Sequence, residues 1–413
     1  MTILPFSHDE IALLSQTNST PFYVYDEQRI RATAQNLFET FRATGLSFTN
    51  FFAVKALPNP SILFMLREEG MGMDCSSMAE LVLAERVGVT REQIFLTSNN
   101  TPEELFAKGI ELGAIINFDD LGHLDFFLEK FGKFPDVGCV RYNPGGQKEG
   151  NAIIGNPKDA KFGMTREQVS EAYRKFRDAG VQRFGIHTMV ASNCLEPEYF
   201  LDTAKMIFTL MLEIRAELGI TFEFVNLGGG FGIPYKPEQS ILNITSIAYG
   251  IKQLHDSILL ENGHPSPKIF MENGRFVTGP HGYLITQVRH QKTSYKHYVG
   301  VDASMANLMR PGMYGAYHHI SVLGKESEPE IELYDVVGGL CENNDKFAID
   351  RKLPRIEVGD LIAIHDTGAH GHAMGFRYNG HLGCAEFLRI KSGDYKMIRR
   401  AETLEDYFAT LNF

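Results

Sequence analysis

Short apolar runs alternate with helical patterns along the first two thirds of the chain. Runs of three to six apolar residues are typical of buried strands, and they occur at 51–54, 71–73, 94–97, 114–118, 137–140, 183–187, 222–227 and 268–271. The segments between them have apolar residues at helical spacing, and many end at a glycine such as Gly113 or Gly219. This alternation predicts a parallel sheet, and eight strand–helix units favour a closed (β/α)8 barrel over an open, doubly wound sheet.

Two helix starts have recognisable caps. Asp26 precedes a helical pattern, and Asn59 is followed by Pro60, which suits the first position of a helix. The apolar side of the helix after Asp26 is expected to contain Ile30, Ala34, Leu37, Phe38 and Phe41.

The helical period stops after about residue 276, and strand patterns replace it. They fall at 283–288, 298–301, 331–336, 360–364 and 386–390. We therefore expect an α/β protein with a (β/α)8 TIM barrel over residues 26–276 and an all-β domain at the C-terminal end. That domain would comprise residues 277–413 and residues 1–25, with the strand-like segment 21–25.

Composition and charge narrow the functional classes. The chain has 413 residues, of which 44% are hydrophobic, but it lacks the long apolar run of a transmembrane helix and the pattern of a signal peptide. A net charge of −11 disfavours non-specific nucleic-acid binding. The 5 cysteines are scattered and lack CxxC spacing, so we predict no disulfide framework and no metal site, and a reducing cytoplasm as the compartment.

Polar residues follow the predicted barrel strands, where a barrel keeps its active site. These positions are Lys55, Asp74, Asn99 and Asn100, Arg141 to Asn143, His187, Gly228 to Gly232, and Glu272 to Arg275. Because the carboxyl ends of barrel strands converge on one face, we expect these residues to meet there.

Gly228, Gly229 and Gly230 predict a phosphate-binding loop. Three glycines after a strand can simply make a sharp turn. However, barrel enzymes often bind phosphate with the loops after strands seven and eight. Here those loops are the glycine triplet, with its bare backbone N–H groups, and the segment ending in Arg275.

Lys55 next to a phosphate site suggests covalent binding of pyridoxal phosphate, because a desolvated amine becomes nucleophilic. Glu272 would then face the pyridine nitrogen and keep it protonated. Purely structural roles remain possible for each residue. Lys55 could be a solvated residue at a strand end, Glu272 could form an ion pair with Arg275, and His187 could be a hydrogen-bonded core residue.

The chain resembles the diaminopimelate decarboxylases, fold-type III pyridoxal phosphate enzymes with the alanine racemase-like architecture, which also include ornithine and arginine decarboxylases. The likeness extends over essentially the whole chain. The matching stretches are FFAVKALPNP (51–60), VRYNPG (140–145), AKFGM (160–164), VNLGGGFGIPY (225–235), ENGR (272–275), NLMRPGMYGAYHH (307–319), CENNDKFAIDRKLP (341–354), GDLIAIHDTGAHG (359–371) and RYNG (377–380).

The resemblance implies a role for each candidate residue. Lys55 would carry pyridoxal 5'-phosphate, and Cys341 would return a proton to the α-carbon. Further cofactor contacts would come from Asp74, His187, Ser192, Gly228, Gly229, Gly230, Glu272, Arg275 and Tyr378. Substrate contacts would come from Arg275, Arg310, Tyr314, Glu342 and Tyr378. The family also implies a head-to-tail homodimer, in which Cys341 and Glu342 enter the site of the other subunit.

Several motifs depart from the family pattern. HxHIGS is His187-Thr-Met-Val-Ala-Ser192, so Met189 replaces the histidine that stacks on the cofactor. A thioether covers the ring but supplies no proton. EPGR has become ENGR, CESGD has become CENND, and the tyrosine of GAY is His370. The substrate surroundings have therefore changed more than the cofactor residues.

The leading hypothesis is decarboxylation of meso-2,6-diaminopimelate to L-lysine, a step of lysine biosynthesis. Arg310 and Glu342 suit a substrate whose distal end has both a carboxylate and an amine. The alternatives are a decarboxylase of another basic or dicarboxylic amino acid, an amino-acid racemase, and a cofactor-free regulator. The pair Cys341 and Glu342 argues against the racemase, and the retained Lys55 and glycines argue against the regulator.

Overall fold

The computed structural model describes residues 4–147 and 156–413, in two compact units. One unit comprises Arg31–Ile233 and Ser240–Phe276, and we call it the barrel unit. The other comprises Met1–Ile30, Pro234–Gln239 and Val277–Phe413, and we call it the β unit. Among the described residues, no helix is both long and apolar enough to cross a membrane.

Eight parallel strands close into a barrel in the order of the sequence. They are β2 (Phe48–Ala53), β3 (Gly72–Cys75), β4 (Ile94–Ser98), β5 (Ile115–Phe118), β6 (Val137–Tyr142), β7 (Arg183–Thr188), β8 (Phe224–Asn226) and β9 (Lys268–Met271). Pairing of β2 with β9, with Thr49 opposite Phe270, closes the ring. The predicted (β/α)8 barrel is confirmed, and every predicted strand position overlaps an observed strand.

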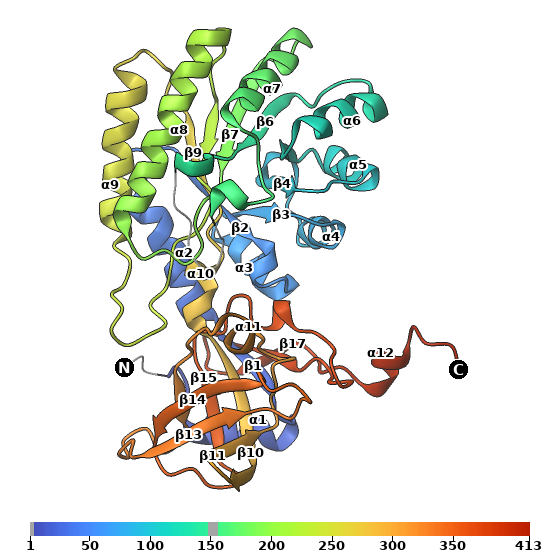
Figure 1. The fold of residues 1–413 in the computed structure, drawn as a ribbon, viewed down its shortest axis with the longest axis vertical. Coiled ribbons are helices and arrows are strands. Elements are labelled where there is room, and N and C mark those ends of the chain that lie inside the picture. Colours follow the sequence, from blue (N-terminus) through green and yellow to red (C-terminus); the bar gives the residue numbers. More distant parts are fainter. Residues whose placement is uncertain (1–3, 148–155) are drawn as a thin grey trace. The chain divides into compact units, whose positions relative to one another are not determined.

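Helices precede or follow the barrel strands along the chain, and most of them lie around the outside of the barrel (Figure 1). They are α2 (Glu27–Arg42), α3 (Pro60–Glu68), α4 (Met78–Arg86), α5 (Glu103–Leu112), α6 (Leu121–Phe131), α7 (Arg166–Asp178), α8 (Pro197–Leu218), α9 (Ile244–Leu254) and α10 (Arg275–Thr278). The two predicted caps are present: Asp26 accepts a hydrogen bond from the Arg29 N–H at 2.9 Å, and Asn59 accepts one from the Ser61 N–H at 3.0 Å. The five apolar positions predicted for α2 are buried.

Aromatic rings fill the barrel interior below the polar strand ends. Phe224 stacks on Phe270 with 4.7 Å between ring centroids, and Phe51 meets Phe270 edge-on at 5.0 Å. Phe95, Ile115, Val137 and Cys139 complete this buried cluster. Because this apolar cluster fills part of the interior, the active site is expected at the carboxyl ends of the strands, as in other barrels.

The β unit is built on one sheet with the strand order β14-β13-β11-β10-β1-β16-β17, to which β12 and β15 are attached. Its strands are β1 (Phe22–Asp26), β10 (Gly282–Thr293), β11 (His297–Val301), β12 (Ile320–Val322), β13 (Glu332–Val337), β14 (Lys346–Leu353), β15 (Leu361–Ile364), β16 (Ala385–Arg389) and β17 (Tyr395–Arg399). The N-terminal strand β1 runs antiparallel to β10 and parallel to β16, so residues from both ends of the chain share this sheet.

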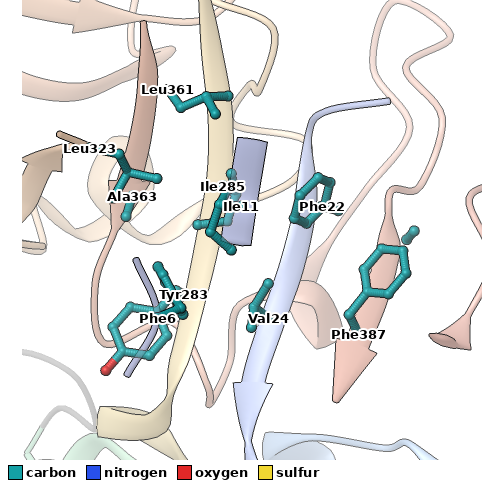
Figure 2. Close-up of a cluster of buried hydrophobic side chains, with 11 residues drawn as sticks. Phe6, Ile11, Phe22, Val24, Tyr283, Ile285, Leu323, Leu361, Ala363 and Phe387 are labelled. Atoms are coloured by element: carbon teal, nitrogen blue, oxygen red, sulfur yellow. The ribbon is translucent and has the colours of Figure 1, made fainter. Parts of the chain in front are cut away.

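The core of the β unit lies between this sheet and an N-terminal helix, α1 (His8–Thr17). Figure 2 shows Phe22 and Val24 of β1 beside Tyr283 and Ile285 of β10, with Ile11 of α1 against them. These side chains are almost fully buried, and their burial contributes about 1.5–3 kcal/mol for each large side chain.

Several elements of the β unit differ from expectation. The segment before residue 21 contains α1, whose Ser7 and Glu10 form a capping box. Strands β12, β14 and β17 were not predicted, and exposed residues interrupt the burial pattern of β14 and β17. An edge strand such as β14 buries little, so its sequence lacks the apolar run that indicated the barrel strands. Two short helices, α11 (Arg310–Tyr314) and α12 (Leu404–Phe408), also belong to this unit.

Candidate active site

Lys55 lies immediately after β2, in a single turn of 3-10 helix over Val54–Ala56. Its Nζ is 4.0 Å from Oδ2 of Asp74, which ends the neighbouring strand β3. The lysine side chain is 55% exposed, whereas the Asp74 side chain is buried and its Oδ1 has no hydrogen-bond partner within residues 4–147 and 156–413. Burial, reinforced by the Glu272 carboxylate, raises the pKa of Asp74 well above its ordinary value.

A cavity of about 260 Å³ opens above Lys55. Its walls come from six barrel strands or the loops that follow them, and they consist of Lys55, Asp74, Ser76, Thr97, Asn99, Arg141, Phe162, His187, Met189, Ser192 and Glu272. The predicted convergence of Lys55, Asp74, Asn99, Arg141, His187 and Glu272 is confirmed by this geometry.

A chain of hydrogen bonds orients His187 at the end of β7. The Asn117 amide donates to His187 Nδ1 at 2.9 Å, and Cys139 Sγ donates to the Asn117 oxygen at 3.4 Å. Since Nδ1 accepts a hydrogen bond, the ring proton lies on Nε2. Nε2 is 3.4 Å from Oε1 of Glu272. The imidazole therefore directs a donor toward the glutamate.

Glu272, directly after β9, is buried and surrounded by donors. The Asn226 amide donates to its Oε1 at 2.8 Å. Burial alone would raise the pKa of Glu272, but His187 and Lys55 hold it below its ordinary value. Two carboxyl groups of one cavity thus have pKa values displaced in opposite directions, that of Asp74 upward and that of Glu272 downward.

The glycine triplet forms a backbone cradle at the end of β8. A Cβ on Gly229 would lie 2.4 Å from the Glu272 carbonyl oxygen, and one on Gly230 would lie 2.7 Å from the Ala191 carbonyl oxygen. Gly230 also has a φ of +99°. The Asn226 side chain accepts a hydrogen bond from Gly228 N–H at 2.9 Å, so Asn226 connects the cradle to Glu272.

Ser192 faces the same cavity from the loop after β7. That loop pairs with the cradle, because Cys194 N–H donates to the Gly230 carbonyl at 2.9 Å and Asn193 Oδ1 accepts from Ile233 N–H at 2.9 Å. Arg275 begins α10 and is 8% exposed. A glycine turn without side chains, a hydroxyl and a buried guanidinium are features that suit a phosphate.

The remaining predicted site residues lie in the β unit. Arg310 begins α11, is 4% exposed, and donates from Nη1 to the Tyr235 hydroxyl at 3.0 Å. Its guanidinium also lies 4.9 Å from the centre of the Tyr235 ring. Tyr314 ends α11 with its side chain partly exposed.

Cys341 and Glu342 lie in an exposed turn next to α11, since a Cβ on Gly312 would be 2.5 Å from the Asn344 carbonyl oxygen. Glu342 Oε1 accepts a hydrogen bond from the Asn344 N–H at 3.0 Å. The β unit therefore brings Arg310, Tyr314, Cys341 and Glu342 into one region. Tyr378 is exposed in the same unit, beside Asn379, whose side chain contacts the Cys341 backbone.

The sequence and the fold were compared with those of known proteins. The family model described as "Pyridoxal-dependent decarboxylase, pyridoxal binding domain" matches residues 27–279. The chain belongs to the pyridoxal-dependent decarboxylases. The predicted family resemblance is thus confirmed, and dependence on pyridoxal is a property of the family as a class.

Individual members of the family match almost the whole chain. The chain is 43% identical to Protein TabA of Pseudomonas amygdali pv. tabaci, over 95% of this chain and 91% of that relative. It is 35% identical to a diaminopimelate decarboxylase of Methanothermobacter thermautotrophicus, over 95% and 92%. A crystal structure of diaminopimelate decarboxylase from M. jannaschii in co-complex with L-lysine aligns with a TM-score of 0.91 and 30% identity, covering 98% of this chain and 94% of that one.

Two departures from the decarboxylase pattern have visible consequences. Asn273 donates its backbone N–H to Asn50 Oδ1 at 2.9 Å, which a proline could not do, and its side chain accepts from Phe231 N–H at 3.2 Å. Asparagine here therefore braces the glycine cradle. Met189 lines the cavity, and its sulfur accepts a hydrogen bond from the Gly229 N–H at 3.1 Å.

Sequence reasoning missed some residues of this decarboxylase site. Asn117 and Asn226 orient His187 and Glu272, but each lies within a predicted strand run (114–118 and 222–227) and not after it. The sequence did contain a signal for both residues, because each is an amide in an otherwise apolar strand. A buried amide needs a hydrogen-bond partner, so each could have been expected to contact another polar group. Phe162 is the third case: its ring lies 4.5 Å from the Arg141 guanidinium, although it is far from any strand end.

The decarboxylase cavity fits a pyridoxal phosphate on its own geometry. Among the described residues, its lining includes the exposed Lys55 amine and the buried Glu272, and the glycine cradle, in which added Cβ atoms would collide with backbone, adjoins Glu272 and Met189 of the lining. The same cavity also contains Asp74, whose buried Oδ1 has no hydrogen-bond partner among the described residues.

Proposed function

We propose that this protein decarboxylates meso-2,6-diaminopimelate to L-lysine with pyridoxal 5'-phosphate as cofactor. The observation that carries the proposal is the pairing of two sets of groups: a lysine, glutamate and glycine cradle in the barrel unit, and the cluster of Arg310 with Cys341 and Glu342 in the β unit. The first set suits a pyridoxal cofactor, and the second suits a substrate with a carboxylate and an amine at its distal end.

In this proposal Lys55 binds the cofactor covalently, and Glu272 holds the proton of the pyridine nitrogen. Gly228, Gly229, Gly230, Ser192 and Arg275 hold its phosphate, while Asp74, His187 and Tyr378 complete the cofactor contacts. The bound cofactor supplies an electron sink for the electron pair released at the α-carbon. Residues 26–276 form the cofactor-binding domain, and residues 1–25 with 277–413 form the β domain.

Substrate recognition in this proposal depends on charge. Arg310, with Tyr314 and Arg275, binds carboxylates, and Glu342 binds the distal ammonium. Cys341 returns a proton to the α-carbon after carbon dioxide has left. Cys341 and Glu342 act in the site of a second subunit, so the working form is a homodimer with shared active sites. The compartment is a reducing cytoplasm, which agrees with five free cysteines.

The second candidate is a decarboxylase of another basic or dicarboxylic amino acid. Two observations favour it: Met189 occupies the position of a family histidine in the cavity wall, and the identity with Protein TabA is 43% against 35% with a diaminopimelate decarboxylase. Both candidates use the same cofactor and the same first bond cleavage, so only the substrate distinguishes them.

The test is kcat/KM for meso-diaminopimelate, L-lysine and L-ornithine, measured by carbon dioxide release from the wild type and Arg310→Ala. Lysine and ornithine offer no distal carboxylate to Arg310. Losing a charge-assisted hydrogen bond costs roughly 1.5–3 kcal/mol, so we expect a preference of at least about ten- to a hundredfold for diaminopimelate. Arg310→Ala should reduce that preference more than it reduces turnover of any amine-only substrate. Equal or faster turnover of lysine or ornithine by the wild type would favour the second candidate.

A further inference from the structure

Three turns of the β unit are joined by hydrogen bonds around Cys341. The first turn contains Ser304 and Met305, the second is 340–345, and the third is 376–381. Met305 N–H donates to Asp345 Oδ1 at 2.6 Å, which joins the first turn to the second. Phe376 N–H donates to the Ala306 carbonyl at 3.2 Å, which joins the first to the third.

The backbone of Cys341 is held from two directions. On one side, Asp345 Oδ2 accepts a hydrogen bond from the N–H of the preceding residue, Leu340, at 2.8 Å. On the other side, the Cys341 N–H donates to Asn379 Oδ1 at 2.8 Å. Two consecutive N–H groups thus have fixed acceptors, which determines the direction of the Cα–Cβ bond of Cys341.

Asn379 is well suited to this task. Its φ is +51°, in the left-handed region that asparagine and aspartate tolerate better than other residues with a side chain. Its own loop is anchored on both sides: Arg377 Nη2 donates to Glu402 Oε1, and Gly383 N–H donates to Glu402 Oε2 at 2.7 Å. The carboxamide therefore reaches Cys341 from a fixed support.

We propose that Asn379 is the positioning residue of Cys341: its side-chain oxygen holds the Cys341 N–H and so sets the direction of the thiol. The proposal rests on the proposed function, in which the Cys341 thiol returns a proton to the α-carbon. In this proposal the RYNG motif (377–380) affects the reaction by positioning the CENND turn (341–345). This role is additional to the cofactor and substrate contacts proposed for Tyr378.

The experiment compares Asn379→Gly with Asn379→Asp in the full-length holoenzyme. Glycine accepts the positive φ but removes the acceptor, whereas aspartate accepts the φ and keeps an acceptor oxygen. Asp350→Gly is the matched control, because Asp350 is an exposed side chain at φ +47° in the same unit. The readouts are the alkylation rate of Cys341 with iodoacetamide, followed by peptide mass spectrometry, and kcat and KM separately. Cys75, Cys139 and Cys384 are buried, which simplifies the alkylation measurement.

We expect Asn379→Gly to be alkylated at Cys341 about two- to tenfold faster and to lose kcat by a similar factor, the range for one hydrogen bond, with KM little changed. Asn379→Asp should restore both readouts toward the wild type, and Asp350→Gly should leave both unchanged. Unchanged alkylation in Asn379→Gly, or an equal defect in Asn379→Asp, would overturn the proposal.

Two further measurements keep the test decisive. Amide hydrogen exchange of the wild type should show protection of the Cys341 N–H, and exchange at the rate of an unbonded amide would overturn the proposal without any variant. Cys341→Ala separates the proposals: full activity in that variant would refute the proposed role of the thiol, whereas the alkylation and exchange results would still decide whether Asn379 holds the turn.

Discussion

Lys55 and Asp74 show how single residues acquire their chemistry from position. The lysine amine is accessible at the mouth of the barrel, and its carboxyl neighbour is buried with one oxygen unpartnered. Burial raises the pKa of Asp74 well above its ordinary value, which weakens its ion pairing with the amine. The exposed Lys55 amine can be approached by a carbonyl group, as nucleophilic catalysis requires.

At this scale we predict that Lys55→Ala abolishes both decarboxylation and covalent trapping of the cofactor by borohydride. The wild-type protein loaded with pyridoxal phosphate should be yellow and should give one modified peptide containing Lys55 after reduction. The variant can bind the cofactor only through the cradle and Glu272, so reduction should leave no labelled peptide. A labelled peptide containing another lysine would show that the assignment is wrong.

Several residues that were singled out because they follow a strand line one cavity, whereas residues that support another side chain were missed. Lys55, Glu272 and the glycines follow apolar runs directly, so the pattern pointed to them. Asn226 and Asn117 act by orienting neighbours that are distant in sequence, and only the folded barrel reveals those contacts. Their partners are fixed by strand register, which a single sequence does not contain.

At the scale of elements, the loop after β8 combines a sharp turn with a donor cradle. We predict that Gly229→Ala weakens pyridoxal phosphate binding by about tenfold or more. The new Cβ would lie 2.4 Å from the Glu272 carbonyl oxygen, so backbone must move, and losing one charge-assisted hydrogen bond to phosphate costs roughly 1.5–3 kcal/mol.

Gly146→Ala, in the loop after β6, is the control, since an added Cβ there would meet no atom of the described residues within 4 Å. Cofactor affinity can be measured by quenching of protein fluorescence, independently of turnover. If Gly229→Ala bound the cofactor as tightly as Gly146→Ala, the triplet would be only a turn.

The elements of the barrel were predictable, but those of the β unit were only partly so. Barrel strands are buried on both sides and therefore read as apolar runs. Strand β14 mixes buried Phe347 with exposed Ile349 and lies at the edge of its sheet, so its apolar residues carry no clear period. Helix α1 did have a signal, the spacing of Ser7 and Glu10, which is typical of a capping box.

At the scale of the whole molecule, the two units divide the proposed chemistry. Apart from Tyr378, the groups proposed to hold the cofactor lie in the barrel unit, and those that suit the distal end of the substrate lie in the β unit. If a second subunit supplies Cys341 and Glu342, each active site needs two chains, and the smallest active species is a dimer.

This arrangement predicts complementation between two inactive variants. In a mixed dimer of Lys55→Ala and Cys341→Ala, one site has both defects and the other has neither. Equal mixing with free subunit exchange makes half of the dimers mixed, so about a quarter of wild-type activity should return. Mixed dimers should be isolated with two different affinity tags, because activity can then be assigned to them alone. Mixed dimers without activity would mean that Lys55 and Cys341 of one chain serve the same site, and the subunits would then work independently.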